Sequence, residues 1–339
     1  MADAAPTAPL LPFAVPLGDP AGIGPEIVAK AWARRSDADL PPFFAVGDSA
    51  ALRAVWDGPV TVISTPIEAS GTFNKALPCL QVADAGPVVP GTPTTDGARA
   101  AFQSLEVAVG LARSGSAGGI VTAPVGKAQL YEVGFTHPGQ TEFIAERCGV
   151  SAQNVVMMLA GPSLRVVPIT IHVALADVPT ALTADLIRAR ALITARGLQR
   201  NFGIAAPRLA VAGLNPHAGE DGALGREEIE MIIPAIEALR ADGLDIAGPF
   251  AADGMFHARA RAGYDAALCM YHDQALIPIK TLDFDAGVNI TLGLPIVRTS
   301  PDHGTAFGIA GQDRANPGAM IAAIRMAAQA AHHRRAHTG

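Results

Sequence analysis

The strongest constraint on the fold is a short apolar run that ends in a cluster of polar side chains. Residues 266–270 read AALCM, and Tyr271, His272, Asp273 and Gln274 follow at once. An apolar run of this length with polar flanks predicts a core β-strand. Because α/β proteins bind their ligands just beyond the carboxyl ends of such strands, this stretch predicts one part of a functional site.

The same succession of apolar strand and helix recurs along the chain. Further strands are expected at residues 13–17, 43–46, 60–63, 80–82, 119–124, 155–159, 165–172, 209–214 and 246–250, and long helices at 96–113, 183–201, 226–240 and 316–335. This alternation predicts an α/β fold with a largely parallel sheet and helices on both faces. Gly161-Pro162, between two middle strands, predicts an antiparallel hairpin. The length of 339 residues predicts two lobes.

The composition argues against several classes of protein. A formal net charge of −6 without a basic stripe argues against nucleic acid as a partner. The three cysteines are odd in number and lack CxxC spacing, which argues against a disulfide framework. Prolines interrupt the apolar N-terminal stretch, so it predicts neither a signal peptide nor a membrane span. We expect a cytoplasmic protein with no membrane partner and with a disordered leader over residues 1–10.

Three histidines share one sequence context, since His172, His217 and His272 each follow an apolar strand. Histidines at strand ends can converge in one cleft, and three neutral imidazoles with an open fourth position suit a catalytic divalent ion. Taken singly, each of these histidines is more often a core or surface residue than a metal ligand. Asp253 and Asp273 are candidates for fixing the ring tautomers; the alternative for each is a helix cap or a surface salt bridge.

A second group of residues predicts an anion site. Lys280 is one of only four lysines in the chain, and Asn289 and Arg298 follow it closely. Arginine offers a bidentate fork to a carboxylate or phosphate, and lysine offers a point charge. Thr141 stands at the start of a short predicted helix, where free N–H groups attract anions, although an ordinary threonine fits there equally well. The residues alone therefore predict a metal-dependent enzyme acting on a small anion, with the reaction left open.

The first strand is followed by a glycine-rich turn over residues 18–26, which read GDPAGIGPE. Its glycines do not have the spacing of a Rossmann fingerprint. Pro25 and Glu26 suit the first turn of a following helix. Two interpretations remain open for this turn: a tight connection between strand and helix, or a loop that lines the active cleft.

At these residues the sequence resembles the 4-hydroxythreonine-4-phosphate dehydrogenase family of vitamin B6 biosynthesis. The resemblance extends over nearly the whole chain and rests on motifs in a fixed order: GDPAGIGPEI, TAPVGKAQL, PGQTEF, HVAL, GLNPHAGEDGALGREE, GPFAAD, MYHDQALIPIK and GVNITLGLPIVRTSPDHGTA. Motifs of this length are specific for the family and much less specific for the substrate.

The resemblance implies a fold similar to that of isocitrate and isopropylmalate dehydrogenases, with two α/β lobes around a mostly parallel sheet and a cleft between them. The first lobe would comprise residues 1–135 and 281–339. The second, residues 136–280, would carry the metal and substrate site and the dimer interface. Residues 303–317 resemble the adenosine-binding loop of those enzymes, which use no GxGxxG motif. The implied cofactor contacts are His303, Gly304, Thr305, Gly311 and Asn316.

The implied reaction is oxidation of the C3 hydroxyl of 4-phosphohydroxy-L-threonine by NAD or NADP, followed by loss of CO2 to give 3-amino-2-oxopropyl phosphate. One divalent ion (Zn²⁺, Mg²⁺, Mn²⁺ or Co²⁺) would polarise the reacting oxygen. The family pattern implies a homodimer in which the partner subunit supplies one histidine ligand. It assigns the metal to His172, His217 and His272, adds Lys280 to the catalytic residues, and assigns the substrate to Gln140, Thr141, Lys280, Asn289 and Arg298.

The chain departs from the family pattern at one position. Where the family commonly reads GHTE, this sequence has Gln140 in place of the histidine. Glutamine can donate and accept hydrogen bonds but carries no proton or charge for catalysis. The departure leaves open a related dehydrogenase for another hydroxy acid, such as a phosphorylated threonate or erythronate or an aromatic cis-dihydrodiol carboxylate. A metal- or ligand-binding protein without turnover is a third interpretation, against which the three histidines and the nucleotide loop argue.

Overall fold

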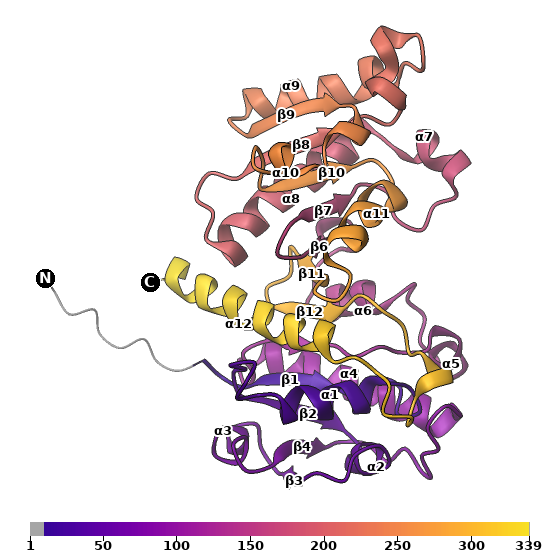
Figure 1. The fold of residues 1–339 in the computed structure, drawn as a ribbon, viewed down its shortest axis with the longest axis vertical. Helices are drawn as coiled ribbons and strands as arrows, with labels where there is room; N and C mark the ends of the chain where they lie inside the picture. The colour runs from indigo at the N-terminus through magenta and orange to yellow at the C-terminus, as the bar shows by residue number, and fades with distance from the viewer. Residues whose placement is uncertain (1–9, 339) are drawn as a thin grey trace, which may run out of the picture. The chain divides into compact units, whose positions relative to one another are not determined.

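The computed structural model describes residues 10–338, so the leader predicted for residues 1–10 lies outside the described residues except for Leu10. Contacts divide these residues into two compact units. The first unit runs to Gly139 and resumes at Pro295, and the second is Gln140–Leu294. Each unit is an α/β structure with its own strands and helices (Figure 1).

The strands of the first unit are all parallel to their neighbours, in the order β3-β4-β2-β1-β5-β12. Their bounds are β1 (Phe13–Pro16), β2 (Phe43–Gly47), β3 (Val60–Ile63), β4 (Leu77–Gln81), β5 (Ile120–Val121) and β12 (Arg298–Pro301). Strands β1 and β2 are buried throughout, as expected for a parallel sheet covered on both faces. The order reverses beside β1, and the carboxyl ends of strands at such a point commonly form a binding crevice.

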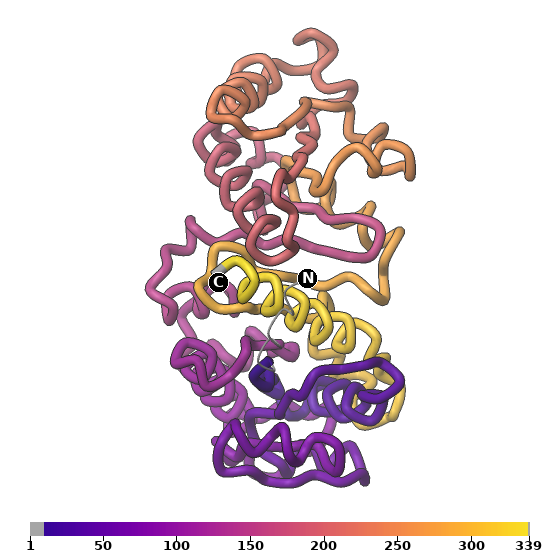
Figure 2. Tube along the Cα trace, turned by 90° about the vertical axis from the view of Figure 1, so that its left-hand side faces the viewer, coloured from indigo at the N-terminus to yellow at the C-terminus, as the bar shows by residue number. Residues whose placement is uncertain are grey.

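Helices cover the sheet of the first unit. They are α1 (Gly24–Ala33), α2 (Ser49–Arg53), α3 (Glu68–Thr72), α4 (Thr95–Arg113), α5 (Lys127–Glu132) and α12 (Gly318–Thr338). Helix α12 packs beside α1 (Figure 2). It also packs against β12, while α4 packs against β1 and β2. Helix α4 is capped by Thr94, whose hydroxyl accepts a hydrogen bond from the Gly97 N–H at 3.0 Å.

The second unit combines parallel and antiparallel strands in the order β11-β6-β7-β10-β8-β9. Strands β7, β10, β8 and β9 are parallel, while β6 pairs antiparallel with both β7 and β11. The β6–β7 pair confirms the hairpin predicted around Gly161-Pro162. The bounds are β6 (Val156–Ala160), β7 (Arg165–Pro168), β8 (Arg208–Ala212), β9 (Asp245–Phe250), β10 (Ala266–Cys269) and β11 (Val288–Leu292).

The second unit has six α-helices. They are α6 (Gln140–Arg147), α7 (Val178–Ala181), α8 (Ala184–Phe202), α9 (Ile233–Ala241), α10 (Ala258–Arg261) and α11 (His272–Asp283). Of these, α8, α9 and α11 pack against the strands. Ala275 and Ile279 of α11 pack into a core cluster with Val166 of β7 and Ala267 of β10. This packing fixes the start of α11 at the end of β10. No helix within residues 10–338 has the length and apolar character needed to cross a bilayer.

Candidate active site

The three histidines predicted as metal ligands follow the carboxyl ends of three neighbouring parallel strands. His172 follows β7, His272 follows β10 and His217 follows β8, and β10 pairs with both other strands. The hydroxyl of Thr170 donates to the Met270 carbonyl at 2.8 Å, which ties the two strand ends together. The rings of His172 and His272 therefore lie side by side, with centroids 5.9 Å apart.

His217 lies in a cavity of about 270 Å³ within the second unit. Tyr271, the residue before His272, lines the same cavity. Asp253 lines it as well, because it follows β9, the strand next to β8. Residues after four adjacent parallel strands thus gather at one edge of this sheet, the edge at which α/β proteins bind their ligands.

The turn that carries His217 has an unusual backbone. Residues 217–221 all have positive φ, at 52°, 51°, 83°, 43° and 53°, although only Gly219 among them is a glycine. Non-glycine residues lose roughly 1–2 kcal/mol each in this conformation. His172 also has a positive φ, of 55°. Strain of this kind persists only where surrounding contacts enforce it, and it gathers at functional sites.

Glu228 supplies those contacts for the turn. Its side chain is 1% exposed and stands at the start of a π-helical turn, η4 (Glu228–Ile232). One carboxylate oxygen accepts the backbone N–H groups of Leu214 at 2.7 Å and Asn215 at 2.8 Å, and the other accepts the Asn215 side-chain amide at 2.9 Å. A Cβ at Gly219 would lie 2.6 Å from that second oxygen, so glycine permits the close approach.

Little in the sequence indicates that Glu228 has this role. The only signal was the acidic pair Glu227-Glu228 near a predicted helix start, a place where acidic residues are common for reasons of the helix dipole alone. Its role depends on hydrogen bonds to Leu214 and Asn215, which lie 14 and 13 positions earlier in the sequence. No local sequence pattern predicts such contacts.

Two further side chains fix the end of β10. The Gln274 amide donates to the Gly213 carbonyl at 2.7 Å and its oxygen accepts the Met270 N–H at 2.6 Å, so it joins the ends of β8 and β10. Asp273 Oδ1 lies 2.7 Å from His272 Nδ1. This contact is the one expected of a residue that sets the histidine tautomer, because it leaves Nε2 with a free lone pair.

The imidazoles of His172, His217 and His272 are suitable ligands for a divalent ion, since neutral imidazole binds several such metals. Within residues 10–338, no three His, Cys, Asp or Glu side chains converge closely enough to hold an ion. His172 and His272 form an adjacent pair, and His217 lines the neighbouring cavity. A pair of ligands from one chain with a further ligand from a second chain is compatible with this arrangement.

The predicted substrate residues are distributed over both units. Gln140 and Thr141 begin α6, Lys280 is exposed in the last turn of α11, and Asn289 lies in β11 opposite Leu159 of β6. The Asn289 Oδ1 atom is buried with no hydrogen-bond partner among the described residues. These residues belong to the second unit.

Arg298 belongs to the first unit, at the start of β12. Its side chain is 4% exposed, and its guanidinium donates to the Thr122 hydroxyl at 3.0 Å. Thr122 directly follows β5, the strand that pairs with β12. An arginine buried at a strand start is unusual for a structural residue, because burying a guanidinium is costly unless its donors are satisfied.

The predicted cofactor residues lie in a loop of the first unit between β12 and α12. His303, Gly304, Gly311 and Asn316 are exposed, and Thr305 is partly buried. The Thr305 carbonyl accepts the Ile23 N–H at 2.9 Å, so this loop contacts the glycine-rich turn. That contact was not predicted from the sequence.

Asp19, in the glycine-rich turn, is a second acidic residue that sequence reasoning missed. It lies between β1 and β5, where the strand order reverses, and its backbone N–H donates to the Pro124 carbonyl at 3.0 Å. The side chain is 2% exposed and accepts the Ala21 N–H at 3.0 Å. Burial raises the pKa of this carboxyl, and the Ala21 hydrogen bond opposes the rise.

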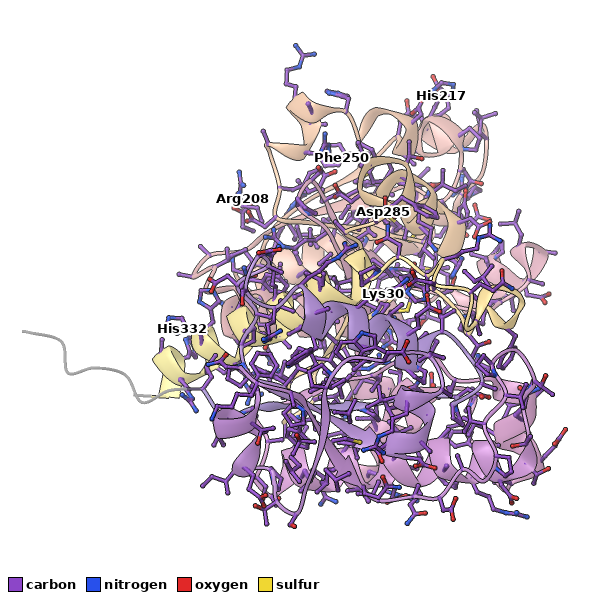
Figure 3. All side chains as sticks on the ribbon, turned by 60° about the horizontal axis from the view of Figure 1, so that its bottom comes forward. Lys30, Arg208, His217, Phe250, Asp285 and His332 are labelled. Atoms are coloured by element: carbon purple, nitrogen blue, oxygen red, sulfur yellow. The ribbon has the colours of Figure 1, made fainter. Side chains whose placement is uncertain are left out.

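A larger, mostly apolar cavity of about 450 Å³ lies elsewhere in the second unit, between β8, β9 and α10. Arg208 and Phe250 line it; Figure 3 labels these two residues and also His217. The Arg208 guanidinium is held by Asp265 at 3.0 Å. None of the predicted site residues lines this cavity, so the smaller cavity with His217 is the candidate active site.

Comparison with known proteins gives a consistent result. Residues 39–327 match the family model for pyridoxal phosphate biosynthetic protein PdxA. A 4-hydroxythreonine-4-phosphate dehydrogenase from Zymomonas mobilis subsp. mobilis is 59% identical over 326 residues, covering 96% of this chain and 97% of that protein. A solved 4-hydroxythreonine-4-phosphate dehydrogenase from Klebsiella pneumoniae has a TM-score of 0.84 and 36% identity, covering 94% and 99%. A terephthalate 1,2-cis-dihydrodiol dehydrogenase from Burkholderia xenovorans LB400 has a TM-score of 0.64 and 29% identity, covering 94% and 98%.

Proposed function

Because the chain belongs to the family of pyridoxal phosphate biosynthetic protein PdxA, we propose that it oxidises 4-phosphohydroxy-L-threonine at C3 with NAD or NADP. The hydride passes to the nicotinamide and the hydroxyl proton is released. The resulting β-keto acid loses CO2 to give 3-amino-2-oxopropyl phosphate, an intermediate of pyridoxal 5′-phosphate biosynthesis. The observation that carries this proposal is the gathering of His172, His217 and His272 after three neighbouring parallel strands.

These three histidines would hold one divalent ion, either Zn²⁺, Mg²⁺, Mn²⁺ or Co²⁺. When bound, such an ion supplies Lewis-acid polarisation of the oxygen at C3. The Asp273 carboxylate accepts the Nδ1–H of His272 and so directs its Nε2 towards a ligand. We assign one of the three histidines to the partner subunit of a homodimer. Exposed apolar side chains in the middle of α11, Ile277 (64%), and just beyond its end, Phe284 (75%), support a subunit contact along this helix.

The remaining residues bind the substrate and manage its charge. Thr141 at the start of α6 and the neighbouring Gln140 would receive the phosphate, because helix N-termini present free N–H groups to anions. Arg298 would bind a carboxylate or phosphate through its fork, and Asn289 would orient a hydroxyl or amino group. The Lys280 ammonium would offset the negative charge that develops when the hydroxyl loses its proton.

The nicotinamide cofactor is assigned to the loop of residues 303–317 in the first unit. His303, Gly304, Thr305, Gly311 and Asn316 would contact it, in the manner of isocitrate and isopropylmalate dehydrogenases. We carry over from those enzymes an arrangement of two lobes with the active site in the cleft between them. A cytoplasmic enzyme without a nucleic-acid or membrane partner completes the proposal.

Absorbance at the NADH band tests this function directly. Purified protein, NAD⁺, a divalent ion and 4-phosphohydroxy-L-threonine are expected to give NADH, and a chelator is expected to stop its formation. NADH formation that is indifferent to chelator would contradict the metal site. If neither NADH nor NADPH forms from this substrate with NAD⁺ or NADP⁺, the proposed reaction is wrong.

A second candidate function is oxidation of a different hydroxy acid, such as phosphorylated threonate or erythronate or a cis-dihydrodiol carboxylate. Gln140 in place of the usual histidine and the similarity to a terephthalate dihydrodiol dehydrogenase favour it. Arg298 and Thr141 favour a phosphorylated acid over a dihydrodiol. Parallel assays with each substrate separate the two functions, since kcat/KM identifies the preferred one.

A further inference from the structure

The glycine-rich turn and helix α1 both contact the loop of residues 303–317 and support it. At one end of the loop, the Thr305 carbonyl accepts the Ile23 N–H at 2.9 Å. A Cβ at Gly22 would lie 3.1 Å from the Thr305 oxygen, so the absence of a side chain allows this approach. The turn is therefore more than a connection between β1 and α1, because it supports a loop nearly 300 residues away in sequence.

At the other end of the loop, Glu26 binds the backbone directly. Its side chain is 2% exposed. Oε1 accepts the Ala315 N–H at 2.9 Å and Oε2 accepts the Gly311 N–H at 3.3 Å. Both donors lie in the loop of residues 303–317, so one carboxylate binds both ends of the turn from Gly311 to Ala315.

Lys30, labelled in Figure 3, lies one helical turn after Glu26 and forms with it a clamp on the loop. Its ammonium lies 2.8 Å from Glu26 Oε1 and 2.8 Å from Asp313 Oδ1, and it donates to the Ala315 carbonyl at 3.0 Å. Ala315 is thus held on both sides, its N–H by Glu26 and its carbonyl by Lys30. Asp313 has a φ of 58° and Gly311 a φ of 72°, so the clamp encloses a tight turn.

We propose that Glu26, acting with Lys30, is a positioning residue that holds residues 305–315 in the conformation that receives the nicotinamide cofactor. This inference rests on the proposed function, since it takes this loop as the cofactor site. Glu26 contacts the loop backbone and needs no contact with the cofactor itself. A loop that is ordered before binding loses less conformational entropy when the ligand arrives, and its affinity is correspondingly higher.

The substitution Glu26→Gln tests the inference with little change in shape. The amide oxygen can still accept one loop N–H, but the amide NH2 now faces either the Lys30 ammonium or the other N–H. We expect the Kd for NADH to rise roughly tenfold, while kcat at saturating nucleotide stays within about twofold. Without nucleotide, we expect the amides of Gly311 and Ala315 to exchange hydrogen about tenfold faster.

Glu230→Gln is the matched control. Glu230 forms an i,i+4 ion pair with Arg226 at 2.6 Å, as Glu26 does with Lys30, but both partners are about three-fifths exposed. The control is expected to bind NADH like the wild type. Asp313→Asn guards against misfolding of the Glu26 variant, because the Asp313 side chain is 91% exposed and asparagine tolerates positive φ. It removes one arm of the clamp, and we expect the Kd to rise about two- to threefold.

The outcomes separate the inference from the function beneath it. If the wild type binds NADH and folded Glu26→Gln and Asp313→Asn both bind it equally well, the positioning role is wrong while the function stands. A fall in kcat at saturating nucleotide as large as the rise in Kd would also overturn it, because positioning of the cofactor loop affects binding first. A wild-type chain that binds neither NADH nor NADPH would overturn the proposed function and this inference with it.

Discussion

Two loops that carry predicted site residues are each held by one buried glutamate, Glu26 in the first unit and Glu228 in the second. The two side chains are 2% and 1% exposed, and each accepts at least two backbone N–H groups from its loop. Both loops follow the carboxyl end of a parallel strand. The two units therefore share one means of holding a loop that follows a parallel strand.

The difference between the two glutamates lies in their partners. Glu26 is paired with the Lys30 ammonium, whereas Glu228 accepts backbone and amide N–H groups from Leu214 and Asn215. The loop on Glu26 turns with a glycine and one strained residue between 311 and 315, but the loop on Glu228 has five successive residues at positive φ. A more strained loop needs closer contacts, so Glu228 should matter more for stability than Glu26.

The largest expected effect comes from Glu228→Ala. It leaves the N–H groups of Leu214 and Asn215 without their acceptor in a buried place, and unsatisfied buried groups cost about 1–3 kcal/mol each. We expect the free energy of unfolding to fall by about 3 kcal/mol or more, measured by urea denaturation. Glu26→Ala should cost less, about 2 kcal/mol, because Lys30 keeps its contacts with Asp313 and the Ala315 carbonyl.

Glu230→Ala, in the same π-helical turn as Glu228, is the control for the loss of a glutamate. Surface substitutions of this kind change the free energy of unfolding by no more than about 0.5 kcal/mol. If Glu26→Ala proves as costly as Glu228→Ala, the strain of the second loop does not distinguish the two regions. If both variants match the control, neither carboxylate is a structural anchor and the comparison fails altogether.

A smaller effect is expected from replacing one glycine in each loop. Gly219→Ala places a Cβ 2.6 Å from Glu228 Oε2 at a φ of 83°, and Gly311→Ala places one 2.6 Å from Pro90 at a φ of 72°. Gly219 is buried and Gly311 exposed. We expect losses of about 2 kcal/mol at Gly219 and about 1 kcal/mol at Gly311, since the exposed loop can shift.

Thermal unfolding of both variants checks this order. Gly115→Ala, also at positive φ (73°) but with no atom within 4 Å of its added Cβ, isolates the backbone strain. A Gly219 variant no less stable than the Gly115 variant would show that contact with Glu228 does not confine the turn.

Much of the architecture followed from periodicity. The alternation of strands and helices predicted a mostly parallel α/β structure, and Gly161-Pro162 predicted the antiparallel hairpin; both are confirmed. The family resemblance is confirmed as well. The placement of His172, His217 and His272 after strands could be predicted for a physical reason: the ends of adjacent parallel strands lie at one edge of a sheet.

The supports of the site could not be predicted in this way. The Glu228 carboxylate binds Leu214 and Asn215, just before the positive-φ residues 217–221. Glu26 binds the backbone of the 303–317 loop, nearly 300 residues away. Such contacts arise from the fold and leave no periodic signal in the sequence. The glycine-rich turn over residues 18–26 fits either a tight connection or a loop of the cleft, and its glycine spacing does not indicate that it supports another loop.

Asp19 gives the smallest expected effect. Among the described residues its carboxylate accepts one backbone N–H, that of Ala21, whereas each of the two glutamates accepts two. Burial raises its folded-state pKa above the ordinary 3.8, with the Ala21 hydrogen bond opposing. The folded state therefore holds the proton more tightly than the unfolded state, so its stabilising contribution is present below pH 3.8 and lost as pH rises through the folded pKa. Asp19→Asn keeps an acceptor for Ala21 without the charge. We expect this variant to be slightly more stable than the wild type at pH 7, with the difference shrinking towards pH 4 in urea denaturation. A difference that grows as the pH falls would show instead that the folded state favours the ionised form of Asp19.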